Sequence, residues 1–261
     1  MLGQDPSQAR DDTRRRYNPG VDLRIRRIED AEDPALEAFG RLQRAVYFEP
    51  DALIPGEWLG RLIQMGSDSR QNFVLLAERD GEVLGGTVFH FLAAAGSGFS
   101  SFMGVAREAR GQGIARALHE ARWSTLEQAA HDELAGVFID VVNPARMSAR
   151  ELKREQAVGS DPQVRRTIFA RLGFRQVDIR YEQPVGGPNG GPVTKLDLLF
   201  YRPRLPNSLP TRLVVDTMRA YWQPWLGPQR AAFHAHELEQ RAGGPELRLI
   251  SPEVMKQSPA R

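Results

Sequence analysis

The hexapeptide Arg110-Gly111-Gln112-Gly113-Ile114-Ala115 follows an apolar, strand-like run and stands at the start of a helical pattern. A helix start offers free backbone N–H groups at the positive end of the helix dipole, and such groups bind phosphate. The two glycines let the backbone approach a ligand, and Ala115 keeps the first helical turn thin. Arg110 and Arg116 add positive charge at the rim. The spacing predicts a pyrophosphate site.

Two other kinds of nucleotide site do not fit this loop. A dinucleotide fingerprint needs a third glycine at the position of Arg116, and the Lys-Ser/Thr pair of a P-loop is absent. The chain has no cysteine, which excludes a cysteine nucleophile, a disulfide and a thiolate-bound zinc.

Two side chains are candidates for proton transfer. Asp140 lies within a very apolar strand, where burial raises the pKa of a carboxyl group into the range of a general base. A structural acid that caps a neighbouring loop is an equal interpretation. His90, on an earlier strand, is the second candidate, although a lone strand histidine is more often a packed core residue. Glu49 and Asp51 are loop acids, which are usually only solvated.

Composition narrows the class of protein. The chain has 261 residues, 41% of them apolar, and a net charge of +2. Such a near balance of charge predicts no binding to nucleic acid as a polycation, and no apolar run is long enough for a membrane span. We therefore expect a cytoplasmic protein without a membrane or nucleic-acid partner. His234 and His236 point to different sides of a helix, so no metal site is predicted.

The pattern of turns and apolar periods predicts an α+β or mixed α/β fold. We expect a flexible tail over residues 1–20, a main domain over 21–204 and a C-terminal appendage over 205–261, with an amphipathic helix from Val214 to Trp225. Strands are predicted at 23–28, 73–78, 83–92, 99–105, 135–142, 177–183 and 195–202, and helices at 31–47, 58–65, 113–130 and 163–172. Asp80-Gly81 predicts a tight hairpin turn.

Several segments in this order resemble the GCN5-related N-acetyltransferase (GNAT) superfamily. Arg110, Gly113 and Ala115 match its Gln/Arg-x-x-Gly-x-Gly/Ala motif. The apolar strand that ends at Asn143, the Leu-Gly-Phe ending at Phe174 and the hairpin over residues 78–86 are similar to other family segments. The resemblance covers residues 21–204.

This resemblance implies a central, mostly antiparallel sheet with splayed fourth and fifth strands and helices on both faces. The C-terminal helical appendage over residues 205–261 lies outside the resemblance. Acetyl-CoA would enter the gap between the splayed strands as co-substrate, without a metal. Backbone N–H groups near Met103, Gly104 and Val105 would bind the thioester carbonyl. The pyrophosphate would lie against Arg110, Gly111, Gln112, Gly113, Ile114, Ala115 and Arg116. Asn143 would approach the CoA arm, although an Asx turn before Pro144 explains it equally well.

The chain departs from the family pattern at two places. Phe169 stands where the family often has a tyrosine that protonates the departing thiolate, and phenylalanine has no proton to give. Tyr181 or Tyr201 could replace it, although each also fits a packing role. The long segment 145–162 is either a lid over CoA or the acceptor, or a solvated helical insert, and the insert is favoured.

The function that we expect is N-acetyltransfer from acetyl-CoA to a primary amine, by direct attack in a ternary complex. The amine belongs to a small molecule or to a protein. One alternative is a non-catalytic acyl-CoA-binding regulator, which Phe169 suggests. Another is an interaction protein that uses the C-terminal aromatic helix, which is also a candidate contact for a homodimer.

Overall fold

The computed structural model describes residues 23–47, 55–185 and 190–252. The predicted tail and the loop acids Glu49 and Asp51 lie outside these residues. Nine strands stand in the order β1-β2-β3-β4-β5-β7-β6-β9-β8. The strands are β1 (Arg24–Arg27), β2 (Arg70–Arg79), β3 (Glu82–Leu92), β4 (Ser97–Val105), β5 (Val137–Val142), β6 (Arg175–Val177), β7 (Leu196–Tyr201), β8 (Ser208–Pro210) and β9 (Glu246–Ile250). All neighbouring pairs are antiparallel except β4 and β5, which run parallel.

The β2–β3 hairpin forms as its turn residues predict. Asp80 and Gly81 both have positive φ, at 52° and 78°. A two-residue turn with two left-handed residues matches the twist of the flanking strands, which is why Asp-Gly is favoured there. The hairpin provides the longest pairing in the sheet and places β4 beside β3.

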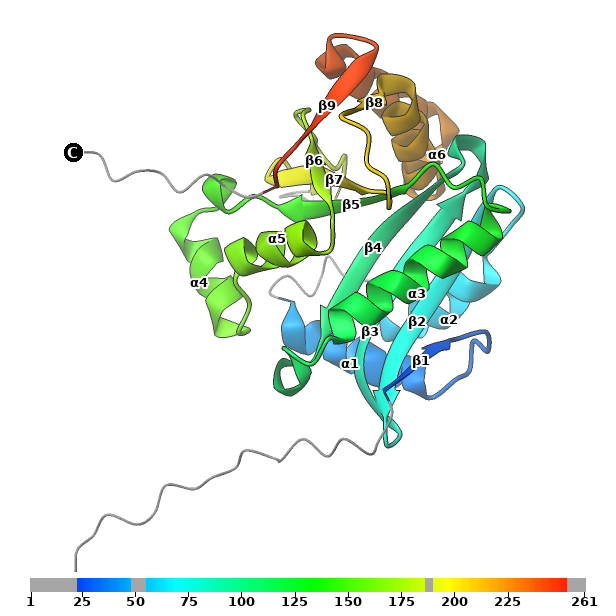
Figure 1. Ribbon diagram of the computed structural model, residues 1–261, viewed down its shortest axis with the longest axis vertical. Helices are drawn as coiled ribbons and strands as arrows, with labels where there is room; N and C mark the ends of the chain where they lie inside the picture. Colours follow the sequence, from blue (N-terminus) through cyan, green and yellow to red (C-terminus); the bar gives the residue numbers. More distant parts are fainter. Residues whose placement is uncertain (1–22, 48–54, 186–189, 253–261) are drawn as a thin grey trace, which may run out of the picture.

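Helices cover both faces of the sheet, as expected. The described residues form α1 (Ala35–Val46), α2 (Gly56–Gln64), α3 (Ile114–Ala129), α4 (Ala149–Ala157), α5 (Pro162–Arg171) and α6 (Thr211–Ala242). In Figure 1, α3 crosses one face of β2 to β4, while α1 and α2 lie on the opposite face. None of the helices in the described part of the chain is both long and apolar enough to span a bilayer.

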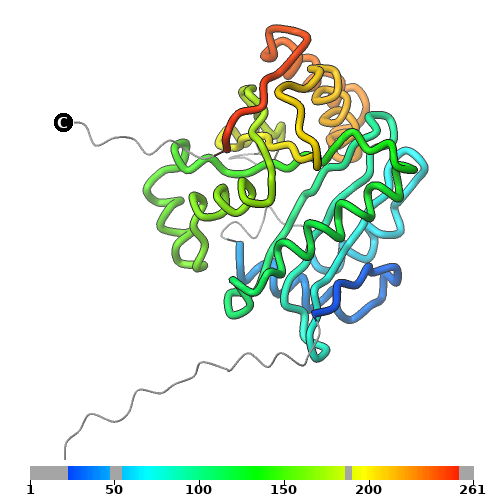
Figure 2. Tube along the Cα trace, viewed as in Figure 1, coloured from blue at the N-terminus to red at the C-terminus, as the bar shows by residue number. Residues whose placement is uncertain are grey.

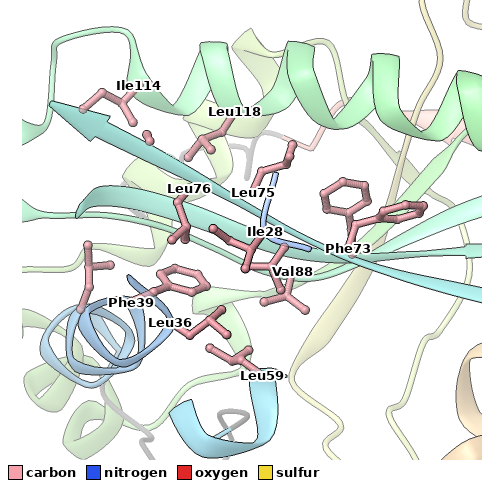
Figure 3. Close-up of a cluster of buried hydrophobic side chains, with 14 of the residues drawn as sticks. Ile28, Leu36, Phe39, Leu59, Phe73, Leu75, Leu76, Val88, Ile114 and Leu118 are labelled. Atoms are coloured by element: carbon pink, nitrogen blue, oxygen red, sulfur yellow. The ribbon is translucent and has the colours of Figure 1, made fainter. Parts of the chain in front are cut away.

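The main core lies on the two faces of β2 and β3. Figure 3 shows Ile114 and Leu118 of α3 above these strands, and Phe39 of α1 with Leu59 of α2 below them. Gly86 of β3 is needed for this packing, because a Cβ atom there would lie only 2.6 Å from the Phe39 ring. Burial of these apolar side chains provides most of the stability of this layer.

The C-terminal residues share a second core with the middle of the sheet. Met218 and Trp222 of α6 are fully buried against Phe99 of β4 and Phe138 of β5. After α6, which is kinked at Gly227, the chain turns back and β9 pairs with β6 and β8 (Figure 2). The helix is longer than predicted, and β8 and β9 were not predicted. The domain division at residue 204 stays a prediction.

Candidate active site

The gap predicted between the fourth and fifth strands is present between β4 and β5. Their parallel pairing consists of Gly98 with Val137 and Phe99 with Phe138, at the beginning of both strands. Beyond these pairs the strands separate, and β5 continues its pairing with β7 alone. The gap is therefore narrow near Phe99 and widens toward the loop that follows β4.

A bulge interrupts β4 directly after the narrow end of the gap. Ser100 is opposite Phe89 and Phe102 is opposite Val88, so Ser101 has no partner position on β3. An extra residue of this kind bends a strand and re-aims its side chains and backbone groups, often next to active sites. Ser101 thus lies on the β4 side of the opening, about 13 Å before the end of the strand at Val105.

The glycine loop lies at the wide end of the gap and begins α3. Gly111 and Gly113 have φ of +80° and +81°, a conformation that favours glycine. Apart from the adjacent residues in the chain, no heavy atom lies within 4 Å of where a Cβ atom would stand at either position, so the loop is open on that side. Gly113 caps α3 without a side-chain bond, and this leaves first-turn N–H groups free for a ligand.

Side chains from other elements hold this loop in place. Gln112 accepts a hydrogen bond from Arg79 Nη1 at 2.8 Å and donates to the Glu108 carbonyl at 3.2 Å. Arg79 is at the end of β2, so the hairpin supports the loop directly. Ile114 is buried under the first turn of α3, whereas Arg116 is exposed at the rim.

The insert between β5 and α5 is tied to the glycine loop. Arg110 Nη1 donates to the Gly159 carbonyl, and Arg107 Nη2 donates to the Ala157 carbonyl at 3.1 Å. Ala157 is the last residue of α4 and Gly159 lies just beyond it, where the negative C-terminal end of the helix dipole favours cations. Burial and the nearby charges of Arg107 and Arg165 lower the pKa of Arg110. The insert is thus a helix that contacts the predicted phosphate site, and positive charges gather at that contact.

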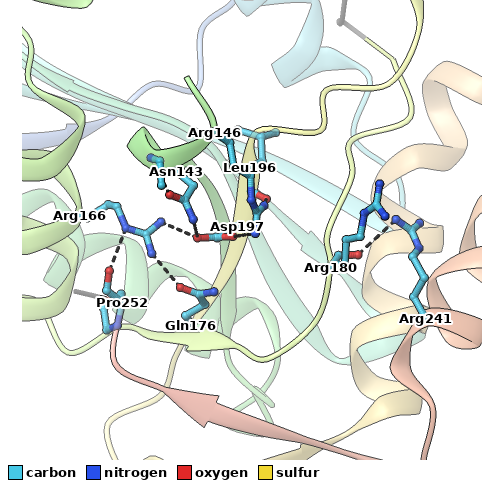
Figure 4. A network of polar contacts seen from close by, with 10 residues as sticks. Asn143, Arg146, Arg166, Gln176, Arg180, Leu196, Asp197, Arg241 and Pro252 are labelled. Carbon is cyan, nitrogen blue, oxygen red and sulfur yellow. Dashed lines mark hydrogen bonds and ion pairs between the residues drawn. The ribbon is translucent and has the colours of Figure 1, made fainter. Parts of the chain in front are cut away.

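Asn143 uses both ends of its side-chain amide within the protein. Its Oδ1 accepts from the Ala145 N–H at 3.0 Å, in an Asx turn, and its Nδ2 donates to Asp197 Oδ2 at 2.9 Å. Asp197 is fully buried and also pairs with Arg166, as Figure 4 shows. These contacts favour the structural interpretation of Asn143 over a direct contact with CoA.

Asp140 stands on β5, two residues beyond the last pairing with β4. Side chains alternate along a strand, so Asp140 shares its face with Phe138, which packs toward α6. The carboxyl group is half-buried, and desolvation raises its pKa to about 6. Tyr181 donates a hydrogen bond to Asp140 Oδ2 at 3.3 Å and another to Gln183 Oε1 at 2.9 Å. Because one phenol hydrogen is shared between two acceptors, this hydrogen bond lowers the pKa of Asp140 by less than burial raises it.

His90 lies in a buried chain of hydrogen bonds on the same face. Its Nδ1 is 2.8 Å from Asn72 Oδ1, and its Nε2 is 2.8 Å from Ser101 Oγ. The Asn72 amide is oriented by a bond from its Nδ2 to the Leu62 carbonyl, so Oδ1 faces the histidine and accepts. His90 therefore carries its hydrogen on Nδ1 and accepts from Ser101 at Nε2. Burial and the charge of Arg70 hold the pKa of His90 well below its usual range.

The far end of this chain is Tyr221, which the sequence did not single out as a site residue. Its hydroxyl is 3.0 Å from Ser101 Oγ, and its ring stacks on Phe99 with centroids 3.6 Å apart. Because Ser101 gives its only hydrogen to His90, Tyr221 is the donor in this bond. The adjacent Trp222 donates from Nε1 to Gln183 Oε1 at 2.8 Å. In the sequence, only the position of Tyr221 and Trp222 in an aromatic stripe of a helix pointed to these residues.

The other face of the sheet holds the remaining aromatic candidates. Phe169 of α5 packs edge-on against Phe174 at 5.4 Å. Tyr201 of β7 contacts His119 and Trp123 of α3. Neither Phe169 nor Tyr201 belongs to the polar group formed by Asp140, Ser101 and Tyr221.

Arg122 of α3 is fully buried on that other face, behind the narrow end of the gap. It donates to Ser100 Oγ at 2.8 Å and to His119 Nδ1 at 2.8 Å, and its Nε has no hydrogen-bond partner. Burial lowers its pKa to about 9. This guanidinium fixes Ser100, next to the bulge, from the side of α3.

Two further features lie away from the gap. A surface cavity of about 420 Å³ beside β1 and β2 is lined by Arg27, Asp68 and Asn72 among others, two strands from the gap. His234 contacts Glu237 and His236 contacts Gln240 along α6. No cluster of metal-ligand side chains occurs within the described ranges.

Comparisons with known proteins agree with this geometry. The acetyltransferase (GNAT) family matches residues 36–155. A solved structure assigned to the GNAT family, from Bacteroides thetaiotaomicron, aligns with a TM-score of 0.53 and 12% identity over 78% of this chain and 98% of its own. At that identity the likeness shows the fold alone.

Two other solved structures have lower TM-scores. A GNAT-family protein from Desulfovibrio desulfuricans has a TM-score of 0.47 and 15% identity over 69% of this chain and 99% of its own. An aminoglycoside 6'-N-acetyltransferase in complex with coenzyme A has a TM-score of 0.48 and 11% identity over 70% and 99%. No curated protein matches the chain. The family match, together with the splayed sheet, shows that this chain carries a domain of the acetyltransferase (GNAT) family.

Proposed function

We propose that this protein transfers an acetyl group from acetyl-CoA to a primary amine, of a small molecule or a protein, in a ternary complex. The observation that carries the proposal is the carboxyl group of Asp140, with its pKa of about 6, in the opening of the β4–β5 gap. A general base is most effective when its pKa lies near the working pH.

In this proposal the two ends of CoA lie at the two ends of the gap. The pyrophosphate binds the N–H groups of the loop from Arg110 to Arg116, with Gly111, Gln112, Gly113, Ile114 and Ala115 between them. The pantetheine arm follows the free edge of β4, and the thioester reaches the narrow end near Ser101. The backbone N–H groups of β4 nearest the thioester then stabilise the oxyanion, and such a donor contributes about 3–4 kcal/mol. Those near Met103, Gly104 and Val105, farther along the strand, bind the pantetheine arm.

The chemical step needs a base and a leaving group. Asp140 takes a proton from the amine, the nitrogen attacks the thioester carbon, and the carbon–sulfur bond breaks to release CoA thiolate. His90 is unsuited to proton abstraction, because both ring nitrogens are used and its pKa is depressed. We therefore assign His90 the role of holding Ser101 in place.

A thiol-release assay with a panel of amines tests the proposal. Wild-type protein is expected to release CoA thiol only when a suitable amine is present. Asp140→Asn should lower kcat/KM by about 10²- to 10⁴-fold while CoA binding stays unchanged. Equal activity of the variant at pH above 7 would remove Asp140 from this role.

A second candidate is an acyl-CoA-binding regulator without transfer activity. It is favoured by Phe169, which offers no proton and packs into the apolar cluster with Phe174. Tight binding of CoA with no amine-dependent thiol release across the panel would support it over acetyl transfer.

Contact with a partner through α6 remains a further proposal, either with another protein or as a homodimer. Trp225 and Phe233 of this helix are exposed, with 43% and 60% of their surface accessible. Truncation at residue 204 is a poor test, because Trp222 is part of the core. Phe233→Ser leaves the core intact, and it should reduce the mass in light scattering if α6 forms a dimer.

A further inference from the structure

Departing CoA thiolate must end as a thiol, and Phe169 cannot supply the proton. A thiol has an ordinary pKa of about 8.5, so a proton donor near the sulfur speeds cleavage at neutral pH. Tyrosine hydroxyls are the candidate donors in the described part of the chain. Their positions relative to the β4–β5 gap show which of them can reach the sulfur.

Two of these tyrosines, Tyr201 and Tyr181, already make contacts that do not suit a donor to sulfur. Tyr201 lies on the α3 face between His119 and Trp123. Tyr181 divides its hydrogen between Asp140 and Gln183. Tyr47, at the end of α1, has its ring edge-on to that of Phe102, with centroids 6.4 Å apart, and provides a control substitution.

Tyr221 has both the position and the orientation of a donor. Its ring stacks on Phe99, the last β4 residue that pairs with β5, so it lies at the narrow end of the gap. Arg70 Nη1 donates to the Tyr221 carbonyl at 3.1 Å and fixes this turn of α6. The hydroxyl points its hydrogen at Ser101 Oγ in the bulge.

Resting on the proposed function, we infer that Tyr221 is the proton source for the leaving thiolate and that Ser101 passes the proton on. As the carbon–sulfur bond breaks, its electron pair goes to sulfur, and Ser101 Oγ–H gives its hydrogen to that sulfur. Ser101 regains a hydrogen from Tyr221. Asp140 releases the proton of the amine to solvent and Tyr221 regains one from solvent, so that in each turnover one proton moves net from nitrogen to sulfur.

The surrounding charges suit this route. The negative charge of Asp140 is among the causes that raise the pKa of Tyr221, after burial, so the two groups interact on one face of the sheet. Arg70 acts in the opposite direction on Tyr221 and stabilises a transient phenolate. His90 holds the Ser101 hydrogen at rest but does not keep it, because protonated histidine is strongly disfavoured there. The C-terminal helix thus completes the active site, outside the residues that match the family.

The test compares two acyl donors in Tyr221→Phe and Ser101→Ala. One donor is acetyl-CoA, and the other is an acetyl thioester of an acidic arylthiol, whose thiolate needs no proton at neutral pH. Both variants should lose about 10²-fold or more in kcat/KM with acetyl-CoA and little with the aryl donor. Tyr201→Phe and Tyr47→Phe are matched controls and should leave the ratio between donors unchanged. If kcat/KM falls equally with both acyl donors, or if Tyr47→Phe also loses activity with acetyl-CoA alone, the inference is overturned.

A second measurement does not need an amine. The ultraviolet absorbance of bound CoA thiolate against pH gives the pKa of the thiol in the binary complex. A proton donor beside sulfur stabilises thiolate, so this pKa should be higher in Tyr221→Phe than in wild type. Failure of wild-type protein to bind CoA overturns the proposed function together with this inference. Binding with the same thiol pKa in both proteins overturns the role of Tyr221 alone.

Discussion

The hydroxyl of Tyr181 lies 3.3 Å from Asp140 Oδ2 and 2.9 Å from Gln183 Oε1. This shared bond lowers the pKa of Asp140, whereas burial raises it, and the result is a pKa of about 6. The protonation state of the proposed base therefore depends on one phenol.

Replacing Tyr181 by Phe should move the acid limb of the activity profile to higher pH. Without the hydroxyl, burial is opposed only by the backbone hydrogen bond to Asp140, so the pKa of Asp140 rises above about 6. A larger fraction of the enzyme then has a protonated, inactive Asp140 at pH 6 to 7. The measurement is kcat/KM against pH with one amine. Tyr201→Phe, on the other face, should leave the limb in place, and a downward movement in Tyr181→Phe would contradict the assignment.

Asp140 should also lower stability at neutral pH. Its folded-state pKa lies above the ordinary 3.8, so between about pH 4 and 6 the folded state binds more protons than the unfolded state. Protonation therefore stabilises the fold at low pH, and this contribution is lost as pH rises through about 6. Asp140→Asn is expected to raise Tm relative to wild type at pH 8, with the difference shrinking toward pH 4. A constant difference across this range would show that the charge is not responsible.

Local patterns in the sequence predicted the parts of this site that depend on neighbouring residues. The dipeptide Asp80-Gly81 alone predicts the turn between β2 and β3, and the glycine loop alone predicts the start of α3. The position of Asp140 in an apolar strand was enough to expect a raised pKa, which the structure confirms. The splayed β4–β5 pair followed from the family resemblance rather than from any local pattern.

The remaining contacts join residues that are far apart in sequence. Ser101 and Tyr221 are separated by 120 positions, and Arg110 and Gly159 by 49. No periodicity indicates which residue of α6 meets which residue of β4, because that depends on how the helix crosses the sheet. For the same reason β8 and β9, which are short and pair mainly with one another, had no recognisable strand pattern.

Gly113→Ala should weaken CoA binding without unfolding the protein. The residue has φ of +81°, and a side chain in that conformation costs about 1–2 kcal/mol even though space is available. Relief of this strain turns the N–H groups at the start of α3 away from the phosphate. Gly243→Ala is a matched control, since it has φ of +67° and open space but caps α6, far from the loop in sequence. Calorimetry should show lower CoA affinity in Gly113→Ala only, with similar Tm losses in both.

Arg110 and Arg107 both anchor the end of α4, but only Arg110 belongs to the phosphate motif. Arg110→Ala should weaken CoA binding more than Arg107→Ala, and it should also reduce the dependence of the affinity on salt. Both variants should loosen α4 and increase cleavage of the 145–162 segment by protease. Equal losses of CoA affinity would instead mean that the arginines act through the position of the insert.

Replacing Arg166 should be the most destabilising single change among the ion pairs. Arg166 is 1% exposed and donates to Asp197 at 2.8 Å, to Gln176 at 2.8 Å and to the Pro252 carbonyl at 2.9 Å. Arg166→Met leaves the fully buried Asp197 carboxylate with Arg146 and Asn143 only, at an expected cost of about 3–5 kcal/mol in the free energy of unfolding.

Denaturant unfolding can measure both a control variant and the cause of this loss of stability. Arg146 pairs with Asp197 Oδ1 at 3.1 Å, but its side chain is 39% exposed, so Arg146→Met should cost less than about 1 kcal/mol. If the loss in Arg166→Met comes from the unpaired buried charge, then adding Asp197→Leu should recover part of it, because the apolar side chain needs no partner. A double variant that is less stable than Arg166→Met would attribute the loss to the bonds with Gln176 and Pro252 instead.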